Sequence, residues 1–212
     1  PKAVTDKNNH LISEITDRHK KIRCVRLLTW VSGNLWSAVN PQLEDLRFSI
    51  GEQCGTLTKA LQGFKHPEAH YNFEWDIAQS LWTKKHLHLF EATEKELLMQ
   101  YQNKFEACQP SYIALRKSIV HNDPNDNNII VTQNRLQPKA KAAIDYGDAI
   151  HTQIINDAAI LCAYGIMGHN DPLDAALAFI KGYHFSFPLL EKEVAHLYNA
   201  IAMRLVIIVT RA

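Results

Sequence analysis

Apolar and polar positions alternate in two short runs near the start of the chain, and a longer period replaces this pattern further on. Residues 10–15 and 22–31 form the two runs, and the turn-like residues 16–19 separate them. Two such runs around a turn are typical of a β-hairpin. From Pro41 to about Gly63, apolar residues recur every three or four positions, which predicts a helix with one buried face. The residues on that face are Leu43, Leu46, Ile50, Cys54, Leu57 and Leu61.

Helical periods dominate the rest of the chain, and short apolar strands lie in its middle. The predicted helices cover residues 74–88, 91–118, 155–168, 171–184 and 191–212. Pro110 is expected to break the second of them, because its ring removes a backbone donor. The predicted strands cover residues 119–120, 128–132 and 140–146. The fold class that follows is α+β: one mostly helical domain after a small β appendage.

Composition excludes several classes of protein. The chain has 212 residues with 46% hydrophobic content, so intrinsic disorder is excluded as its main state. Its 23 Lys and Arg residues nearly balance 22 Asp and Glu residues, and a net charge of +1 does not favour nucleic acid as a partner. The four cysteines are far apart and form no C-x-x-C pair, which favours reduced thiols and a cytoplasmic location.

Neither a membrane span nor a signal peptide is predicted. A spanning helix needs about 18 or more apolar residues without charges, and no such run occurs. The most apolar stretch, Leu205–Val209, is bracketed by Arg204 and Arg211. The first residues lack a starting Met and an apolar signal region, and the last residues stop inside a helical pattern. We therefore expect this sequence to be a piece of a longer protein.

The densest polar segment of the chain, His121–Asn128, lies between two predicted strands, and Asp145 follows the next strand. Mg²⁺ prefers carboxylate and amide oxygens and keeps several waters, so one Asn and one Asp would suffice as protein ligands. In phosphoryl transfer to an alcohol, a further Asp orients the hydroxyl and accepts its proton. The spacing H-x-D-x-x-x-x-N with a later Asp supplies these groups: Asp123 for the acceptor hydroxyl, and Asn128 for a metal held with Asp145.

These motifs resemble those of the aminoglycoside phosphotransferase and choline kinase superfamily, small-molecule kinases with a protein-kinase-like fold. The resemblance is carried by His121–Asp123 with Asn128–Ile130, by Ile144–Asp148 and by Asn156–Ala159. The family usually has Gly after the His of this motif. Asn122 stands there in this chain, and Asn tolerates a left-handed backbone better than most residues.

The resemblance implies a role for each matching residue. It implies that Asp123 is the catalytic base and that Asn128 and Asp145 are magnesium ligands. Asp157 would be a buried carboxylate that braces the catalytic loop, and His121 would support the site structurally.

The segment Val25–Gly33 resembles the family's hinge between two lobes, where backbone groups meet the adenine of ATP, and GTP stays an alternative nucleotide. The hinge residues are Leu27, Leu28, Thr29 and Trp30. Only 26 residues precede Leu27, and no Gly-rich phosphate motif occurs. We therefore expect residues 1–31 to hold part of the amino-terminal lobe with the hinge, and residues 32–212 to form the helical carboxy-terminal lobe. The rest of the nucleotide-binding half would lie outside this sequence, so the isolated piece is expected to be inactive.

Within the superfamily, the hydroxylysine kinase branch is most similar to Arg26–Gly33, Phe73–Asp76 and Asp145–Asp148. This implies an acceptor such as hydroxylysine or another small amino alcohol, with aminoglycosides as the wider class. A cationic amine would suit the carboxylates of Asp148 or Glu74, either of which would otherwise serve a second metal. Similar domains are sometimes fused to aminotransferases, which makes such an enzyme one expected fusion partner.

Other interpretations of these residues have less support. An Asn- and Asp-rich loop is also common turn chemistry, although the later Asp145 favours a site. The pair His66/His70 lacks the His-Glu adjacency of a metalloprotease motif, and His86/His88 is spaced as on a surface turn. No G-x-S-x-G elbow indicates a hydrolase. The main alternative is a non-catalytic kinase-like binding module, against which the complete catalytic set argues.

Overall fold

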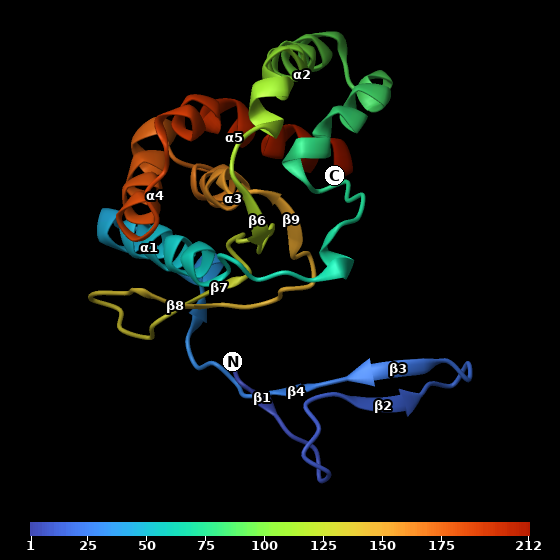
Figure 1. The fold of residues 1–212 in the computed structure, drawn as a ribbon. Coiled ribbons are helices and arrows are strands. Elements are labelled where there is room, and N and C mark those ends of the chain that lie inside the picture. Colours follow the sequence, from blue (N-terminus) through green and yellow to red (C-terminus); the bar gives the residue numbers. More distant parts are fainter. The chain divides into compact units, whose positions relative to one another are not determined.

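The computed structural model describes residues 1–212, which divide into two compact units, Pro1–Gly33 and Asn34–Ala212 (Figure 1). The first unit is entirely β, and the second contains all the α-helices. The predicted α+β class is therefore confirmed. The predicted domain boundary after residue 31 stays a prediction, although the division by contacts lies two residues later.

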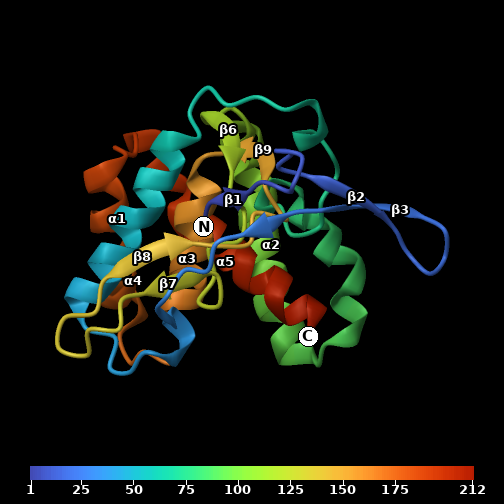
Figure 2. The same cartoon turned by 90° about the horizontal axis from the view of Figure 1, so that it is seen from below.

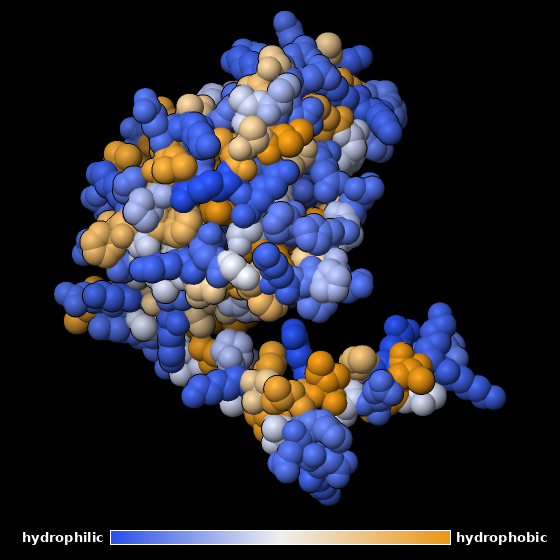
Figure 3. Space-filling view, viewed as in Figure 1, coloured by the Kyte–Doolittle hydropathy of each residue, from blue (hydrophilic) through white to orange (hydrophobic).

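The smaller unit consists of two antiparallel strand pairs. Strand β1 (Ala3–Val4) pairs with β4 (Leu27–Leu28). Strands β2 (Ser13–Thr16) and β3 (Ile22–Val25) form the predicted hairpin. Its turn is closed by Asp17, whose Oδ1 accepts hydrogen bonds from the amides of residues 19 and 21. None of the side chains of this unit is buried, and several apolar ones stand on the hairpin surface in Figure 3.

The larger unit is built around helix α3 (Ile155–Gly165), almost all of whose residues are buried. Such a helix must be covered on every side, because its sequence is apolar all round. Helix α1 (Glu44–Ala60), helix α4 (Pro172–Ser186) and helix α5 (Glu191–Arg211) pack against it. Figures 1 and 2 show α3 between these helices and the small strands.

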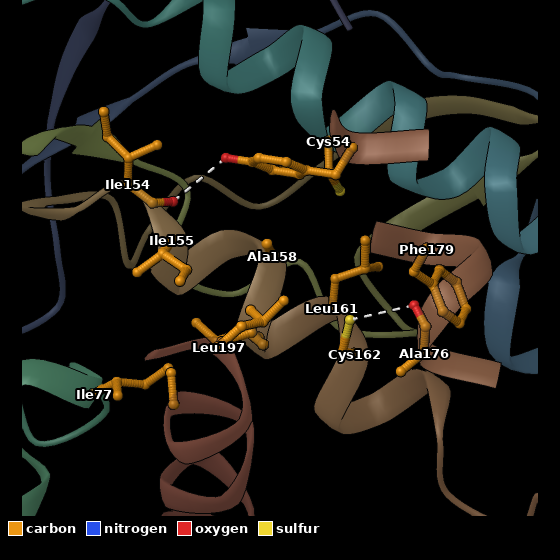
Figure 4. Close-up of a cluster of buried hydrophobic side chains, with 14 of the residues drawn as sticks. Cys54, Ile77, Ile154, Ile155, Ala158, Leu161, Cys162, Ala176, Phe179 and Leu197 are labelled. Atoms are coloured by element: carbon orange, nitrogen blue, oxygen red, sulfur yellow. Dashed lines mark hydrogen bonds between the residues drawn. The ribbon is translucent and has the colours of Figure 1, made fainter. Parts of the chain in front are cut away.

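Side chains from several elements meet α3 in this core (Figure 4). Cys54 comes from α1, Phe179 from α4 and Leu197 from α5. The hydroxyl of the buried Tyr183 donates to the Thr58 hydroxyl at 2.8 Å and lies 3.4 Å from the carbonyl oxygen of Ile154. The first turn of α3 is therefore fixed by both apolar packing and hydrogen bonds.

Two small sheets carry the polar loops. Strand β6 (Lys117–Val120) pairs antiparallel with β9 (Ile150–Gln153). Strand β7 (Ile129–Val131) pairs with both β5 (Asn34–Leu35) and β8 (Ala140–Ala143). Loop 121–128 therefore connects the two sheets, and loop 144–149 connects them again.

The remaining elements are helical. They are the 3₁₀ turns η1 (Trp36–Ala38), η2 (Pro67–Ala69) and η3 (Ile77–Leu89), and helix α2 (Ala92–Ile113).

Two of the predicted helices differ from the structure. Pro110 lies inside α2 and does not break it, because Phe105 and Tyr112 on either side are buried in the core. The helix predicted to reach residue 118 ends at Ile113, since residues 117–120 pair with β9 instead. The helix predicted over residues 74–88 is a run of 3₁₀ turns, and β9 was not predicted at all.

Helix α5 is long and apolar enough, by length and composition, to cross a membrane. In the structure it packs against α2, α3 and η3, and the buried guanidinium of Arg204 on this helix pairs with Asp123. These contacts bury one face of the helix, which amounts to 39% of its most apolar stretch. The absence of a membrane span stays a prediction.

Helices α1 and α4 approach each other so closely that glycine is required at their contact. A Cβ atom on Gly182 would lie 2.0 Å from the carbonyl oxygen of Phe48, and one on Gly51 would lie 2.0 Å from that of Phe179. Both clashes are with backbone atoms, so the two helices would have to separate to admit a side chain.

Gly182→Ala is therefore expected to lower the free energy of unfolding by about 1–3 kcal/mol, as overpacked cores do. The clash outweighs the gain of about 1 kcal/mol in helix propensity. Urea unfolding measures the change. Lys181→Ala, at the exposed preceding position, is the control and should stay within about 0.5 kcal/mol of wild type. Equal stability of Gly182→Ala and wild type would contradict the close contact.

Candidate functional site

The carboxylate of Asp157, in the first turn of α3, holds the start of loop 121–128 through hydrogen bonds. Asp157 Oδ2 accepts a hydrogen bond from the amide of His121 at 3.1 Å, and Oδ1 accepts one from the amide of Asn122 at 2.8 Å. Burial raises the pKa of the Asp157 carboxyl, and His121 and the two amides act in the opposite direction. The structure thus places Asp157 where a brace for the loop would have to lie.

His121 connects the same loop to the end of β8. Its Nε2 lies 2.9 Å from the carbonyl oxygen of Ile144, and its Nδ1 accepts a hydrogen bond from the amide of Asp123 at 3.3 Å. With Nδ1 as acceptor, Nε2 carries the proton and donates it to the Ile144 carbonyl. The His121 ring also lies 4.7 Å from the ring of Tyr146, centroid to centroid. Its contacts are those of a structural residue.

Asn122 has a left-handed backbone, with φ of 63°. This conformation accounts for Asn at a position where the related family usually has Gly, because Asn adopts it more readily than most residues. Both polar atoms of its side chain are buried without a hydrogen-bond partner in the chain.

Asp123 is held through both of its carboxylate oxygens. Oδ2 accepts hydrogen bonds from the Nδ2 atoms of Asn125 at 2.7 Å and Asn128 at 2.8 Å. Oδ1 accepts one from Nη2 of Arg204 at 2.7 Å. The Asp123 side chain is 18% exposed, so it is reachable from solvent. Burial raises the pKa of Asp123, while Arg204 and Asn125 lower it.

The two predicted metal ligands are brought together by the β7–β8 pairing. The amide of Ile144 donates to the carbonyl oxygen of Asn128 at 2.9 Å, so Asp145 directly follows the residue bonded to Asn128. The Asn128 side chain donates through Nδ2 to Asp123, which leaves Oδ1 as the acceptor atom of this amide. Asp145 is exposed, with φ of 61°, and its Oδ1 accepts from the amide of Gly147 at 3.2 Å.

This oxygen set fits a hard divalent cation. No group of three or more His, Cys, Asp or Glu side chains in the chain is arranged to hold a metal. A cation here would therefore take Asn128 and Asp145 as its protein ligands and complete its coordination with water or phosphate oxygens, as Mg²⁺ commonly does.

The two residues predicted for a substrate amine or a second metal lie in different surroundings. Asp148 is partly buried, and its charge raises the pKa of both Asp123 and Tyr71, so it lies within electrostatic range of the catalytic loop. The carboxylate of Glu74 forms an ion pair with Arg211 near the end of α5. Glu74 thus has an internal partner, and the structure does not bring it together with Asp123.

The predicted hinge residues belong to the smaller unit. Leu27 and Leu28 pair with β1, and Thr29 Oγ1 accepts a hydrogen bond from the amide of Lys2 at 2.8 Å. Trp30 is 89% exposed. Contact of these four residues with adenine stays a prediction.

Several residues that contact Asp123 or its partner Arg204 were not predicted from the sequence. Arg204 of α5 forms an ion pair with Asp123. The same guanidinium stacks on the ring of Trp75 and donates a hydrogen bond to the Trp75 carbonyl oxygen. One signal in the sequence could have indicated Arg204, namely a single cation within the apolar run from Ala200 to Val209.

Comparisons with known proteins show which family and which relatives this chain is similar to. The family described as "Phosphotransferase enzyme family" matches residues 10–193. Hydroxylysine kinase of Xenopus laevis is 28% identical over 222 residues, which are 96% of this chain and 58% of that protein. Hydroxylysine kinase of Mus musculus is 25% identical over 210 residues, which are 94% of this chain and 56% of that protein. The chain thus spans little more than half the length of these relatives.

Solved structures share the fold. An amicoumacin kinase in complex with AMP-PNP and Ca²⁺ has a TM-score of 0.71 at 17% identity, covering 99% of this chain and 63% of that one. A microcompartment-associated aminopropanol kinase also has a TM-score of 0.71 at 17% identity, covering 99% of this chain and 66% of that one. These similarities confirm the kinase-like fold, and the family match confirms the resemblance drawn from the motifs.

Asp157→Asn is expected to loosen the catalytic loop. The new side chain can accept from only one of the two loop amides and presents an NH₂ group to the other. Loss of a buried hydrogen bond of this kind costs about 1–3 kcal/mol, so the unfolding midpoint of the larger unit should fall in urea.

Asp17→Asn is the matched control, because Asp17 also accepts from two backbone amides but lies in an exposed turn of the smaller unit. It should leave the midpoint of the larger unit unchanged. Equal midpoints for Asp157→Asn and wild type would show that Asp157 does not brace the loop.

Proposed function

Because this chain belongs to the phosphotransferase enzyme family, we propose that the protein transfers the γ-phosphate of ATP to a hydroxyl group of a small, amine-bearing molecule. The observation that carries the proposal is that Asn128 bonds the Asp123 carboxylate through its side chain and Ile144, the residue before Asp145, through its backbone. This is the set of groups that phosphoryl transfer to an alcohol requires.

Asp123 acts as the base in this proposal. Its carboxylate accepts a hydrogen bond from the acceptor hydroxyl and orients the oxygen towards the γ-phosphorus. It takes the proton as the new O–P bond forms and the bond from the γ-phosphorus to the bridging oxygen breaks, which releases the nucleoside diphosphate. Partial burial raises the pKa of the Asp123 carboxyl, which makes its ionised form a better proton acceptor than an exposed carboxylate. Asn125 and Asn128 hold Oδ2 in place during this step.

Asn128 and Asp145 would hold the magnesium ion, through Oδ1 of the amide and through the carboxylate. When bound, the ion supplies charge neutralisation at the nucleotide phosphates. Asn128 joins the base to the metal ligands, because its amide nitrogen donates to Asp123 while its oxygen stays available. The related structure bound to AMP-PNP and Ca²⁺ supports the use of a nucleotide and a divalent cation.

The nucleotide would contact the hinge residues Leu27–Trp30 of the smaller unit. This part of the proposal rests on the family resemblance of that segment and leaves ATP and GTP to be compared directly. The four cysteines are free thiols, which suits the cytoplasmic location that we include in the proposal.

The acceptor is proposed to be an amino alcohol such as hydroxylysine. The names of the relatives, hydroxylysine kinase and aminopropanol kinase, support an acceptor that carries both an amine and a hydroxyl. Asp148 lies within electrostatic range of Asp123 and would attract an ammonium group. Glu74 is a weaker candidate than Asp148, because Arg211 already neutralises its carboxylate. No feature of the site favours a non-catalytic module.

The full-length protein is expected to phosphorylate at least one member of a panel of hydroxylysine, simple amino alcohols, choline and aminoglycosides, with ATP or GTP. Asp123→Asn should reduce kcat by roughly 10²- to 10⁴-fold, the usual contribution of general acid–base catalysis. Asp126→Asn, in the same loop, is the control and should keep wild-type kcat. Near-normal turnover of folded Asp123→Asn would remove this residue from the mechanism.

Asp145→Asn is expected to raise the magnesium concentration needed for half-maximal activity by at least about tenfold, since even a supporting partner of a metal ligand has an effect of that size. Activity is measured against added Mg²⁺ at saturating acceptor, and chelation by EDTA should abolish it. Asp126→Asn again serves as the control. An unchanged magnesium requirement in Asp145→Asn would contradict the assignment of this ligand.

A further inference from the structure

Arg204 is one of two charged residues that α5 buries in the larger unit, the other being Glu193, and it is placed against the catalytic carboxylate. Its side chain is 2% exposed. Nη2 donates to Asp123 Oδ1 at 2.7 Å, and Nη1 donates to the carbonyl oxygen of Trp75 at 3.1 Å. The guanidinium lies 4.7 Å from the Trp75 ring centroid and 5.6 Å from that of Tyr164.

Stability alone does not explain this arrangement. Burying a guanidinium and a carboxylate removes both from water, and apolar residues of similar volume often give equal or greater stability at such positions. The Nε atom of Arg204 is also buried without a hydrogen-bond partner, which adds to the cost. The surrounding helix is apolar, so a Leu or Met would fit its pattern. A buried Arg here therefore points to a requirement set by Asp123.

A count of hydrogen bonds shows which oxygen of Asp123 is available for an acceptor hydroxyl. A carboxylate offers about two in-plane lone pairs on each oxygen. Both positions on Oδ2 are taken, by Asn125 and Asn128. Oδ1 accepts only from Arg204, so one of its positions is open. The acceptor hydroxyl would therefore bind to Oδ1, beside the guanidinium.

The second hydrogen-bond partner of Arg204, the carbonyl of Trp75, is itself held in place by its neighbour Asp76. Next to Trp75, the buried carboxylate of Asp76 accepts hydrogen bonds from Oγ1 of Thr152 and from Nδ2 of Asn156, each at 2.9 Å. These two residues belong to β9 and to the first turn of α3. The carbonyl that receives Nη1 of Arg204 is thus tied to the same framework that holds the catalytic loop.

We propose that Arg204 is a positioning residue of the phosphotransfer reaction, which holds the Asp123 carboxylate so that the open position on Oδ1 receives the acceptor hydroxyl. This inference rests on the proposed function. It concerns a residue outside the part of the chain that the family matches, residues 10–193. The planar guanidinium suits the role, because its two terminal nitrogens bond Asp123 and Trp75 at once while its face stacks on the ring.

The test compares Arg204→Met and Arg204→Lys with wild type in the full-length protein. Arg204→Met should lower kcat roughly 10²-fold, the loss expected when a reacting group is misplaced by about 1 Å, and leave the KM for the nucleotide unchanged. Arg204→Lys keeps the charge but cannot bond Asp123 and the Trp75 carbonyl at the same time, so its kcat should lie between those of wild type and Arg204→Met. Wild-type kcat in folded Arg204→Met would overturn the proposal.

Arg116→Met is the matched control. Arg116 also bonds a carboxylate, Glu193, at 2.6 Å and a carbonyl oxygen, that of Pro188, at 3.0 Å, and it lies 4.9 Å from the ring of Phe187. It has no contact with Asp123. It directly precedes the first residue of β6, the end of the strand that is opposite loop 121–128. Loss of Arg116 should reduce the thermal midpoint with kcat unchanged. An equal fall of kcat in both Met variants would mean that destabilisation alone causes it and would overturn the positioning role.

A second measurement does not depend on turnover. Thermal midpoints of Arg204→Met, Asp123→Asn and the double variant should be non-additive, because either single change leaves a buried partner uncompensated. Additive shifts would overturn the role of Arg204 but not the proposed function, even if the wild-type enzyme is active. If the shifts are non-additive but the wild-type protein phosphorylates no acceptor, the proposed function is overturned, and the role of Arg204 with it.

Discussion

The carboxylate of Asp157 connects the core of the larger unit to the loop that carries the reactive groups. It lies in the first turn of α3, a helix that other elements cover on every side. It accepts hydrogen bonds from the backbone amides of two successive loop residues. Burial disfavours its charge, whereas the two amides and the positive end of the α3 dipole favour it. The position of the catalytic loop is therefore set by core packing.

The carboxylate of Asp123 is held by two separate parts of the structure, its own loop and helix α5. From within the loop, Asn125 and Asn128 hold one oxygen, and from α5 the guanidinium of Arg204 holds the other. Asn128 also extends the β7–β8 ladder through its carbonyl oxygen, which brings Asp145 beside it. The proposed base and the proposed metal ligands thus depend on the same few hydrogen bonds, and displacement of one would disturb the others.

The sequence was sufficient for the parts of the fold in which one periodicity covers a long segment. Helices α1, α3, α4 and α5 follow from their apolar patterns, and the hairpin follows from its turn. Strand β9 could not be found this way, because its four residues become a strand only by pairing with β6. Pro110 was misjudged because the packing of α2 outweighs one missing hydrogen bond.

The candidate site shows the same limit. Loop 121–128 and Asp145 were predicted because their spacing along the chain matches the chemistry, although their roles stay predictions. Arg204 was not predicted, since it lies 81 residues from Asp123 and a lone Arg in an apolar helix has no motif. Contacts made only by tertiary packing, such as the stacking of this guanidinium on Trp75, leave almost no trace in local sequence.

The separation between Asp123 and Arg204 has a consequence for the nascent chain. During synthesis the loop leaves the ribosome well before α5 does, so its carboxylate is at first hydrated and without its cation. The ion pair forms only when α5 docks and expels that water. A nascent chain that does not yet include α5 therefore lacks the cationic partner of Asp123, and its reactive centre is incomplete.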